Sequence, residues 1–229
     1  MPLPKISHPT FDMTVPSTGK KVQFRPFTGR EQKILLIAKE SDDPKDALRA
    51  VAQIIESCFP GVSGQDVPIF DLEYMFLQLR AKSVSNKIEL RIEDEDDGQT
   101  YDATADLDAV EIVKPEGWDD NVVKITDSIG MKLKYPTVRS VLSGSKDMDQ
   151  WDILASSVDS IYEGDTVTSS KEVTVQELRD WLMSLPLEAI DPVKSFFDNR
   201  PKVKINISYV RKDGKAVTRE VSSIQDFFE

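Results

Sequence analysis

The residues best suited to covalent chemistry or metal binding are scarce in this sequence of 229 residues, which holds one cysteine, Cys58, and one histidine, His8. A lone cysteine excludes a disulfide within the chain, and one Cys with one His cannot complete a Cys/His zinc site. His8 lies in a proline-rich stretch, away from any rigid element that could align it with a serine. Cys58 ends a helical row of apolar residues and is expected to pack in the core.

An acidic run, Glu93-Asp94-Glu95-Asp96-Asp97-Gly98, places carboxylates at alternate positions, as a calcium-binding loop does. An EF-hand also needs a glutamate six residues after its glycine, where this chain has Thr104, and a helix on each side. We therefore interpret the run as the turn of a β-hairpin, with Asp97-Gly98 supplying a positive φ. The five acids Glu93, Asp94, Glu95, Asp96 and Asp97 are a candidate surface for a basic protein partner, and a solvated turn is the alternative.

Other catalytic patterns are incomplete. Ser143 and Lys146 have the Ser-x-x-Lys spacing of penicillin-recognising enzymes, but the companion motifs are missing. Carboxylate pairs could hydrolyse a glycoside, yet the three tryptophans and five tyrosines do not cluster near acids as a sugar-binding cleft would require. No glycine-rich phosphate loop follows a strand. The sequence thus predicts a non-enzymatic protein with no catalytic, cofactor-binding or metal-binding residue and no small-molecule substrate.

The overall charge and the lengths of the apolar runs argue against two further kinds of partner, nucleic acids and membranes. The chain has 29 Lys and Arg against 40 Asp and Glu, a net charge of −11, which repels phosphate backbones and argues against nucleic-acid binding. No apolar run reaches the roughly 20 residues that cross a bilayer, and the N-terminal stretch lacks the apolar block of a secretion signal. We expect no membrane association and a protein that works in the cytoplasm where it is made.

One helix is expected to organise the chain. After Pro68, apolar residues fall on two sides of a helix that runs to about Ser83, which predicts burial from both sides at the centre of the core. The period then changes to two, with Ile88, Leu90 and Ile92 alternating with charged residues, as in a half-buried strand.

The elements before Pro136 are mostly hairpins. Thr28 and Glu31 have capping-box spacing at the start of one helix, and Asp43-Pro44 opens another that ends at Cys58. The remaining predicted strands form hairpins or short runs at residues 10–27, 88–107, 110–113 and 122–135.

The elements after Pro136 are mostly helical. A short helix carries Val138, and a long one is predicted from Met148 to Tyr162 by an apolar face that includes Trp151, Leu154 and Val158. Residues 163–171 are polar and are expected to form a mobile loop. Helices then begin at the capping box of Thr174 and at Asp191-Pro192, before a hairpin that turns at Lys212-Asp213-Gly214.

These elements predict an α+β fold. Residues 1–135 form a mixed region of antiparallel hairpins around the central buried helix, and residues 136–229 form a helical region that ends in a C-terminal β-hairpin. One continuous domain is the alternative, because no long linker separates the two. The chain closes with Ile224, Phe227 and Phe228, which either pack into the core or anchor a partner.

Several segments, in the same order over nearly the whole chain, resemble the baseplate hub assembly proteins of T-even-like contractile-tailed bacteriophages. The segments are Phe24-Arg25-Pro26-Phe27-Thr28 with the following Glu31…Leu35-Leu36, then Phe70-Asp71…Tyr74 to Val84, Leu133-Lys134-Tyr135-Pro136, Phe196-Phe197…Pro201-Lys202-Val203, and Asp226-Phe227-Phe228. Some members carry Cys-x-x-Cys in the C-terminal strand region, where this chain has Tyr209 to Gly214 without cysteine.

The resemblance implies a late phage protein that helps to build the central hub of the baseplate, as an assembly chaperone or scaffold that binds other hub or baseplate proteins. A minor subunit retained in the virion baseplate is the first alternative, and a cell-wall hydrolase of the tail tip is the second. The implied location is the host cell cytoplasm, or the baseplate of the virion if the chain stays in the particle.

Overall fold

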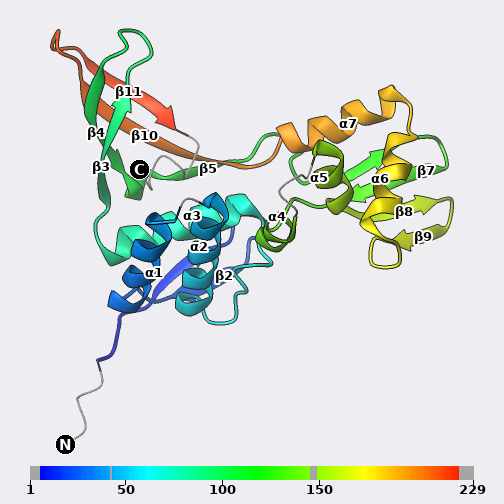
Figure 1. Ribbon diagram of the computed structural model, residues 1–229, viewed down its shortest axis with the longest axis horizontal. Coiled ribbons are helices and arrows are strands. Elements are labelled where there is room, and N and C mark those ends of the chain that lie inside the picture. Colours follow the sequence, from blue (N-terminus) through cyan, green and yellow to red (C-terminus); the bar gives the residue numbers. More distant parts are fainter. Residues whose placement is uncertain (1–5, 42, 145–148, 222–229) are drawn as a thin grey trace, which may run out of the picture. The chain divides into compact units, whose positions relative to one another are not determined.

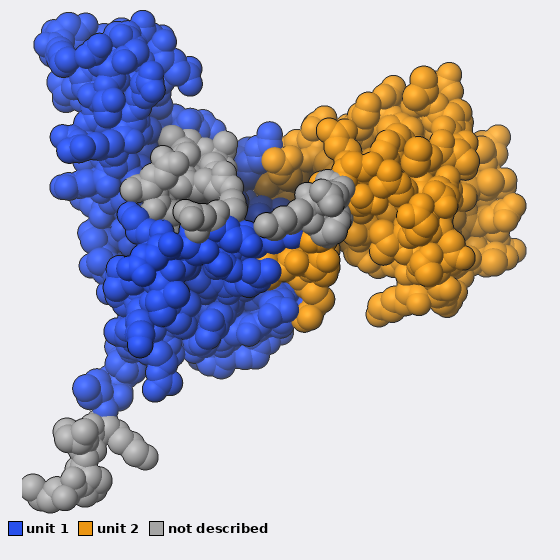
Figure 2. Space-filling view, viewed as in Figure 1, with its two compact units in different colours: residues 1–113, 202–229 blue, residues 114–201 orange. Residues whose placement is uncertain are grey.

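The computed structural model describes residues 6–41, 43–144 and 149–221 (Figure 1). Helices and antiparallel sheets occur in both halves of the chain, which confirms the predicted α+β class. The chain divides into two compact units, one formed by residues 1–113 with 202–229 and the other by residues 114–201 (Figure 2). These limits differ from the boundary expected near residue 135. The C-terminal hairpin belongs with the N-terminal elements, and residues 114–135 belong to the second unit, where β7 pairs with β8.

The first unit begins with a two-stranded hairpin and two helices. Strands β1 and β2 pair antiparallel, with Phe11 opposite Phe24. Thr28 and Glu31 form the predicted capping box of α1, and the Asp43 side chain accepts a hydrogen bond from Lys45 N at the start of α2. Phe24 stacks on Phe59, with ring centroids 4.9 Å apart, so the hairpin is tied to the end of α2. The bounds are β1 Phe11–Thr14, β2 Lys21–Phe24, α1 Gly29–Lys39 and α2 Pro44–Cys58.

The central helix is α3, Ile69–Ser83, which begins directly after Pro68. As predicted, it is buried on more than one side; its buried residues are Phe70, Asp71, Leu72, Met75, Phe76, Leu77 and Leu79. Asp71 is the one acid among them, and Ser17 N donates to its Oδ1 at 3.0 Å. Gly64, in the loop before α3, lies so close to α2 that an added Cβ would be 2.2 Å from the carbonyl oxygen of Ala52. The loop and α2 therefore pack without free space at this point.

The main sheet of the first unit has the order β11-β10-β4-β3, and β5 also pairs with β10. The predicted hairpins β3–β4 and β10–β11 are both present, with Gly98 (φ +65°) and Gly214 (φ +84°) in their turns. One face of the sheet packs on α3, in a core of Leu77, Ile88, Tyr101, Ala103, Ala105, Leu107, Val110, Val203, Ile205, Ile207 and Tyr209. The bounds are β3 Lys87–Glu93, β4 Thr100–Asp106, β5 Glu111–Val113, β10 Lys202–Val210 and β11 Ala216–Val221, with a 3-10 turn η1 at Leu107–Ala109.

The second unit has a separate four-stranded antiparallel sheet, in the order β6-β7-β8-β9, with helices packed against it. Its core comprises Val123, Met131, Leu133, Ala155, Val158, Leu178, Leu182, Val193 and Phe196. The strands are β6 Val122–Lys124, β7 Ile129–Leu133, β8 Val158–Glu163 and β9 Thr166–Ser169. The helices are α4 Val138–Ser143, α5 Gln150–Ser156, α6 Val175–Met183 and α7 Leu187–Asp198.

The long helix predicted from Met148 to Tyr162 is wrong. Met148 lies outside the described residues, α5 ends at Ser156, and the chain continues as strand β8. Val158 and Ile161 satisfy a helical period, but β-branched residues also favour strands, and β7 offers β8 a partner. The polar stretch 163–171, expected to be a loop, contains β9, which pairs with β8 around a turn at Gly164.

The start predicted for the last helix at Asp191-Pro192 is also wrong. Helix α7 begins at Leu187, after Pro186, and Pro192 lies inside it. A proline in that place removes one helical hydrogen bond. The helix is held instead by its buried face, which includes Ile190, Val193 and Phe196.

Candidate interaction surface

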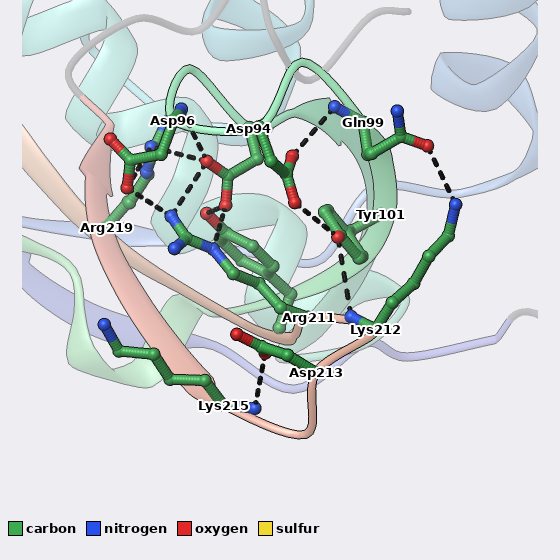
Figure 3. Close-up of polar contacts among 11 residues, drawn as sticks. Asp94, Asp96, Gln99, Tyr101, Arg211, Lys212, Asp213, Lys215 and Arg219 are labelled. Atoms are coloured by element: carbon green, nitrogen blue, oxygen red, sulfur yellow. Dashed lines mark hydrogen bonds and ion pairs between the residues drawn. The ribbon is translucent and has the colours of Figure 1, made fainter.

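The most distinctive polar arrangement in the described chain joins the turns of two hairpins that are far apart in sequence. The β3–β4 turn brings Asp94 and Asp96, and the β10–β11 hairpin brings Arg211 and Arg219 (Figure 3). The same hairpin also brings Tyr209. The two hairpins meet because β4 pairs with β10 in the middle of the sheet. We call these five residues the hairpin-tip cluster.

Asp94 is the centre of the cluster, and its side chain is fully buried. Its Oδ2 accepts hydrogen bonds from Tyr209 Oη and Arg211 Nε, both at 2.6 Å. Its Oδ1 accepts from Arg211 Nη2 at 2.9 Å and from Arg219 Nη2 at 3.0 Å. A buried carboxylate is tolerated when cations and hydrogen-bond donors replace the water it has lost. These bonds, with Arg211 contributing most, hold the pKa of Asp94 well below its usual range.

The neighbouring groups respond to the same charges. Asp94 first and Asp96 second raise the pKa of Arg211, whose side chain is only 14% exposed. Asp96 contacts both arginines but remains 70% exposed, so it closes the outer side of the cluster. Burial, together with the hydrogen bond to Asp94, raises the pKa of Tyr209. Asp94 and Arg211 therefore stay charged near neutral pH, and Tyr209 stays neutral.

A pair of aromatic rings continues the contact between the two hairpins. Tyr101 of β4 stacks on Tyr209 of β10, with ring centroids 5.4 Å apart. Tyr101 Oη donates to Asp97 Oδ2 at 2.7 Å, and this bond raises the pKa of Tyr101. Lys212 Nζ donates to Gln99 Oε1 at 2.8 Å and connects the two turns directly (Figure 3). Charge pairs and stacked rings therefore fix the two turns to each other.

The five acids predicted as a partner surface have different environments. Glu93, Glu95, Asp96 and Asp97 are exposed, whereas Asp94 is buried. The expectation of a solvated turn, or of an accessible acid, is therefore wrong for Asp94, because two arginines and a tyrosine enclose it. The other predicted partner residues, Ile224, Phe227 and Phe228, lie outside the described residues.

Arg211, Arg219, Tyr209 and Tyr101 were missed as site residues by sequence reasoning. The available signal was weak: acids in one hairpin turn, and two arginines flanking another. Only the pairing of β4 with β10 brings the two together, across 117 residues of sequence in the case of Arg211 and Asp94. Nothing local to either hairpin indicates that pairing.

The cysteine and the histidine lie apart from this cluster. Cys58 is fully buried, and burial raises the pKa of its thiol to about 11. His8 is exposed near the start of the described chain. Among the described residues, no three His, Cys, Asp or Glu side chains are arranged to hold a metal ion. None of the helices in the described ranges combines the length and apolar composition needed to cross a bilayer.

Comparison with known proteins identifies the family. The family model described as T4 bacteriophage base plate protein matches residues 8–229, which is nearly the entire chain. Neither the search of curated proteins nor the search of solved structures returned a match. The match confirms the resemblance to baseplate proteins of T-even-like phages at the level of the baseplate. The chain therefore belongs to the T4 bacteriophage base plate protein family.

Proposed function

We propose that this baseplate protein helps to assemble the central hub of the baseplate as a non-enzymatic scaffold or chaperone that binds other baseplate proteins. Family membership supports a structural role in the baseplate, and the resembling segments favour the hub. The observation that carries the binding role is the hairpin-tip cluster. It fixes two turns to each other with paired charges, while acids beside it remain exposed.

A rigid end of a sheet is suited to recognition because little conformational freedom is lost when a partner binds. Arg211 bonds Asp94 through two nitrogens, and such paired contacts restrict rotation more than a single contact does. Glu93, Glu95 and Asp97 adjoin the cluster in the sequence and are exposed, as is Asp96 within it, on an already acidic protein. The partner that fits this charge is a basic surface of another baseplate protein.

The direct test is to isolate the tagged chain from phage-infected cells and to identify the bound proteins by mass spectrometry. Recovery of hub or other baseplate proteins is expected. Recovery of no phage protein, under conditions that preserve other baseplate subassemblies, would refute the proposal.

The same tagged chain separates an assembly factor from a retained subunit. Quantitative mass spectrometry of purified virions should find it depleted relative to known baseplate subunits if it acts as a chaperone. Stoichiometric amounts would assign it instead to the mature baseplate as a minor subunit. Purified protein is expected not to clear peptidoglycan, and clearing would favour the hydrolase alternative.

The acidic turn can be tested without disturbing the buried network. Replacing exposed Glu95 with Ser should lower the association rate with the hub partner about twofold at low ionic strength and should reduce its dependence on salt. Glu163→Ser, at an exposed acid in the second unit, is the matched control for the change in net charge. Equal rates for wild type and Glu95→Ser would exclude this residue from the interface.

Ile224, Phe227 and Phe228 are proposed as a second anchor for a partner. Deleting residues 224–229 should abolish partner binding while leaving the melting temperature unchanged. A large fall in melting temperature would show instead that these apolar side chains complete the fold of the protein itself.

A further inference from the structure

Strand β3 is an edge of the main sheet. It pairs with β4 on one side and has no second neighbour in the part of the chain that the structure describes (Figure 1). Its seven residues, Lys87 to Glu93, alternate between charged and apolar side chains. An edge of this length offers a row of backbone donors and acceptors to another strand.

The hydrogen bonds at the two ends of β3 indicate which backbone groups face the open edge. Leu107 N donates to Asn86 O at 2.6 Å, and Asp94 N donates to Gln99 O at 2.8 Å. The register between β3 and β4 runs without a shift between these bonds. In an antiparallel ladder hydrogen-bonded residues alternate, so the even-numbered residues of β3 bond to β4. The backbone groups of Lys87, Glu89, Arg91 and Glu93 therefore face the open edge.

The charges along β3 are self-complementary. The sequence Lys-Ile-Glu-Leu-Arg-Ile-Glu has its centre at Leu90, and residues equally distant from that centre are opposite in charge or alike in apolar character. A second copy, placed antiparallel about Leu90, sets Lys87 opposite Glu93 and Glu89 opposite Arg91. It also sets Ile88 opposite Ile92 and Leu90 opposite itself.

This register matches the outward-facing backbone groups and gives the most pairs of opposite charge. Centring on Ile88 or Ile92 pairs only Lys87 with Glu89 or only Arg91 with Glu93. A shift by one residue would oppose outward-facing backbone groups to groups that already bond β4. Moving the centre to residue 89 sets Glu89 against Glu89, and moving it to residue 91 sets Arg91 against Arg91. Like charges directly opposite each other are unfavourable, so the neighbouring registers are disfavoured.

We infer that β3 forms a two-fold interface with β3 of a second copy of this chain, which continues the sheet across the pair. Ile88 is buried, whereas Leu90 and Ile92 are only partly buried at the edge of the core, so pairing would cover them further. Charged side chains usually keep an edge strand from pairing. Here the order of positive and negative side chains along β3 permits pairing with one partner, the same strand in another copy.

Among the described residues, the interactions inside a single chain leave this edge available. Arg91 Nε lies 3.4 Å from Asp102 Oδ1 of β4, but both side chains are more than four-fifths exposed, 82% and 87%. An ion pair exposed to this extent contributes little and does not hold Arg91 away from a second partner. At the end of the strand, the hairpin-tip cluster fixes the chain just beyond Glu93. The edge is therefore presented in a defined conformation.

Charge exchange on the full chain, followed by sedimentation velocity up to about 200 µM, tests the pairing. The wild type is expected to dimerise reversibly. Glu89→Lys places a lysine opposite Arg91 of the other copy, and Arg91→Glu places a glutamate opposite Glu89, so each variant alone should associate at least about tenfold more weakly. An equimolar mixture of the two variants restores opposite charges at both positions and should recover dimers. The double variant should dimerise as the wild type does.

Glu116→Lys, at an exposed acid in the second unit, controls for the change in net charge and should leave dimerisation unaltered. A wild type that stays monomeric up to about 200 µM overturns the inference. It is also overturned if either single variant dimerises as strongly as the wild type, if their mixture fails to recover association, or if Glu116→Lys weakens it equally.

Discussion

Removing the charge of Glu31 should destabilise the protein in a way that depends on pH. Glu31 is 1% exposed and lies at the third position of α1. It accepts hydrogen bonds from Arg25 Nη2 at 2.9 Å, from Thr28 N at 2.8 Å and from Thr28 Oγ1 at 2.7 Å. Burial by itself would raise the pKa of Glu31, but the hydrogen bonds from Arg25 and Thr28 outweigh it and lower the pKa from 4.5 to about 2.

The size of the destabilisation follows from the linkage between proton binding by Glu31 and folding. A pKa lowered from 4.5 to about 2 corresponds to roughly 3 kcal/mol of folding free energy at neutral pH. Arg25 is 30% exposed, and screening by solvent reduces the expected value to about 2–3 kcal/mol. Because the unfolded chain binds this proton at a higher pH than the folded chain, the stabilisation is complete above the unfolded pKa. It is lost as pH falls from 4.5 toward 2, by about 1 kcal/mol at pH 4 and about 2 kcal/mol at pH 3.

The assay is urea denaturation of wild type and Glu31→Gln between pH 7 and the lowest pH at which the wild type folds. Glutamine keeps the shape of the side chain but has no charge, so it mimics the protonated acid at every pH. The difference in unfolding free energy should be largest at pH 7 and should shrink below about pH 5. Glu40→Gln, at the exposed C-terminal cap of the same helix, should change stability by less than about 0.5 kcal/mol.

A difference between wild type and Glu31→Gln that stays constant over this pH range would refute the reasoning. It would mean that the substitution acts through packing and not through the charge. A difference at pH 7 no larger than that for Glu40→Gln would show that the hydrogen bonds to Glu31 do not stabilise the folded state.

Three further predictions concern packing, reactivity and the hairpin-tip cluster. Gly64→Ala should destabilise the protein by about 1–3 kcal/mol in urea denaturation, because its Cβ would overlap the backbone of α2, whereas Gly29→Ala, with open space around it, should be neutral or stabilising. Cys58 should react with a thiol reagent at pH 8 only as fast as the protein unfolds, since it is buried and its pKa is raised to about 11; rapid labelling of folded protein would contradict this. Asp94→Asn should lower the melting temperature by about 5 °C or more, because two arginines lose their buried counter-charge, and exposed Asp96→Asn should lower it less; equal shifts would argue against a central role for Asp94.

Elements with a local signal could be predicted from the sequence. The capping boxes of Thr28 and Thr174 start helices where they were expected, because the cap and its helix lie within four residues. The hairpin turns at Gly98 and Gly214 follow from residues that permit positive φ. The buried position of α3 also follows from its own residues, since apolar side chains on two sides of a helix require neighbours on both.

Other features depend on contacts that no local pattern reveals. Trp151, Val158 and Ile161 fit one helical face, yet only the availability of β7 as a partner decides that Val158 and Ile161 belong to a strand. The acids of the β3–β4 turn could be recognised as a charged surface, but the burial of Asp94 could not. That burial depends on Arg211 and Arg219, which reach Asp94 only after β10 has paired with β4.

The pairing of β5 with β10 has a consequence for how this chain can vary. Val113 lies opposite Lys202, so the chain leaves the first unit and re-enters it at neighbouring points on adjacent strands. Residues 114–201 are thus an inserted unit whose two ends lie close together. Insertions of this kind can change in length or be exchanged without disturbing the fold of the domain that carries them. Replacing residues 114–201 with a short glycine-rich loop should therefore leave the β11-β10-β4-β3 sheet intact.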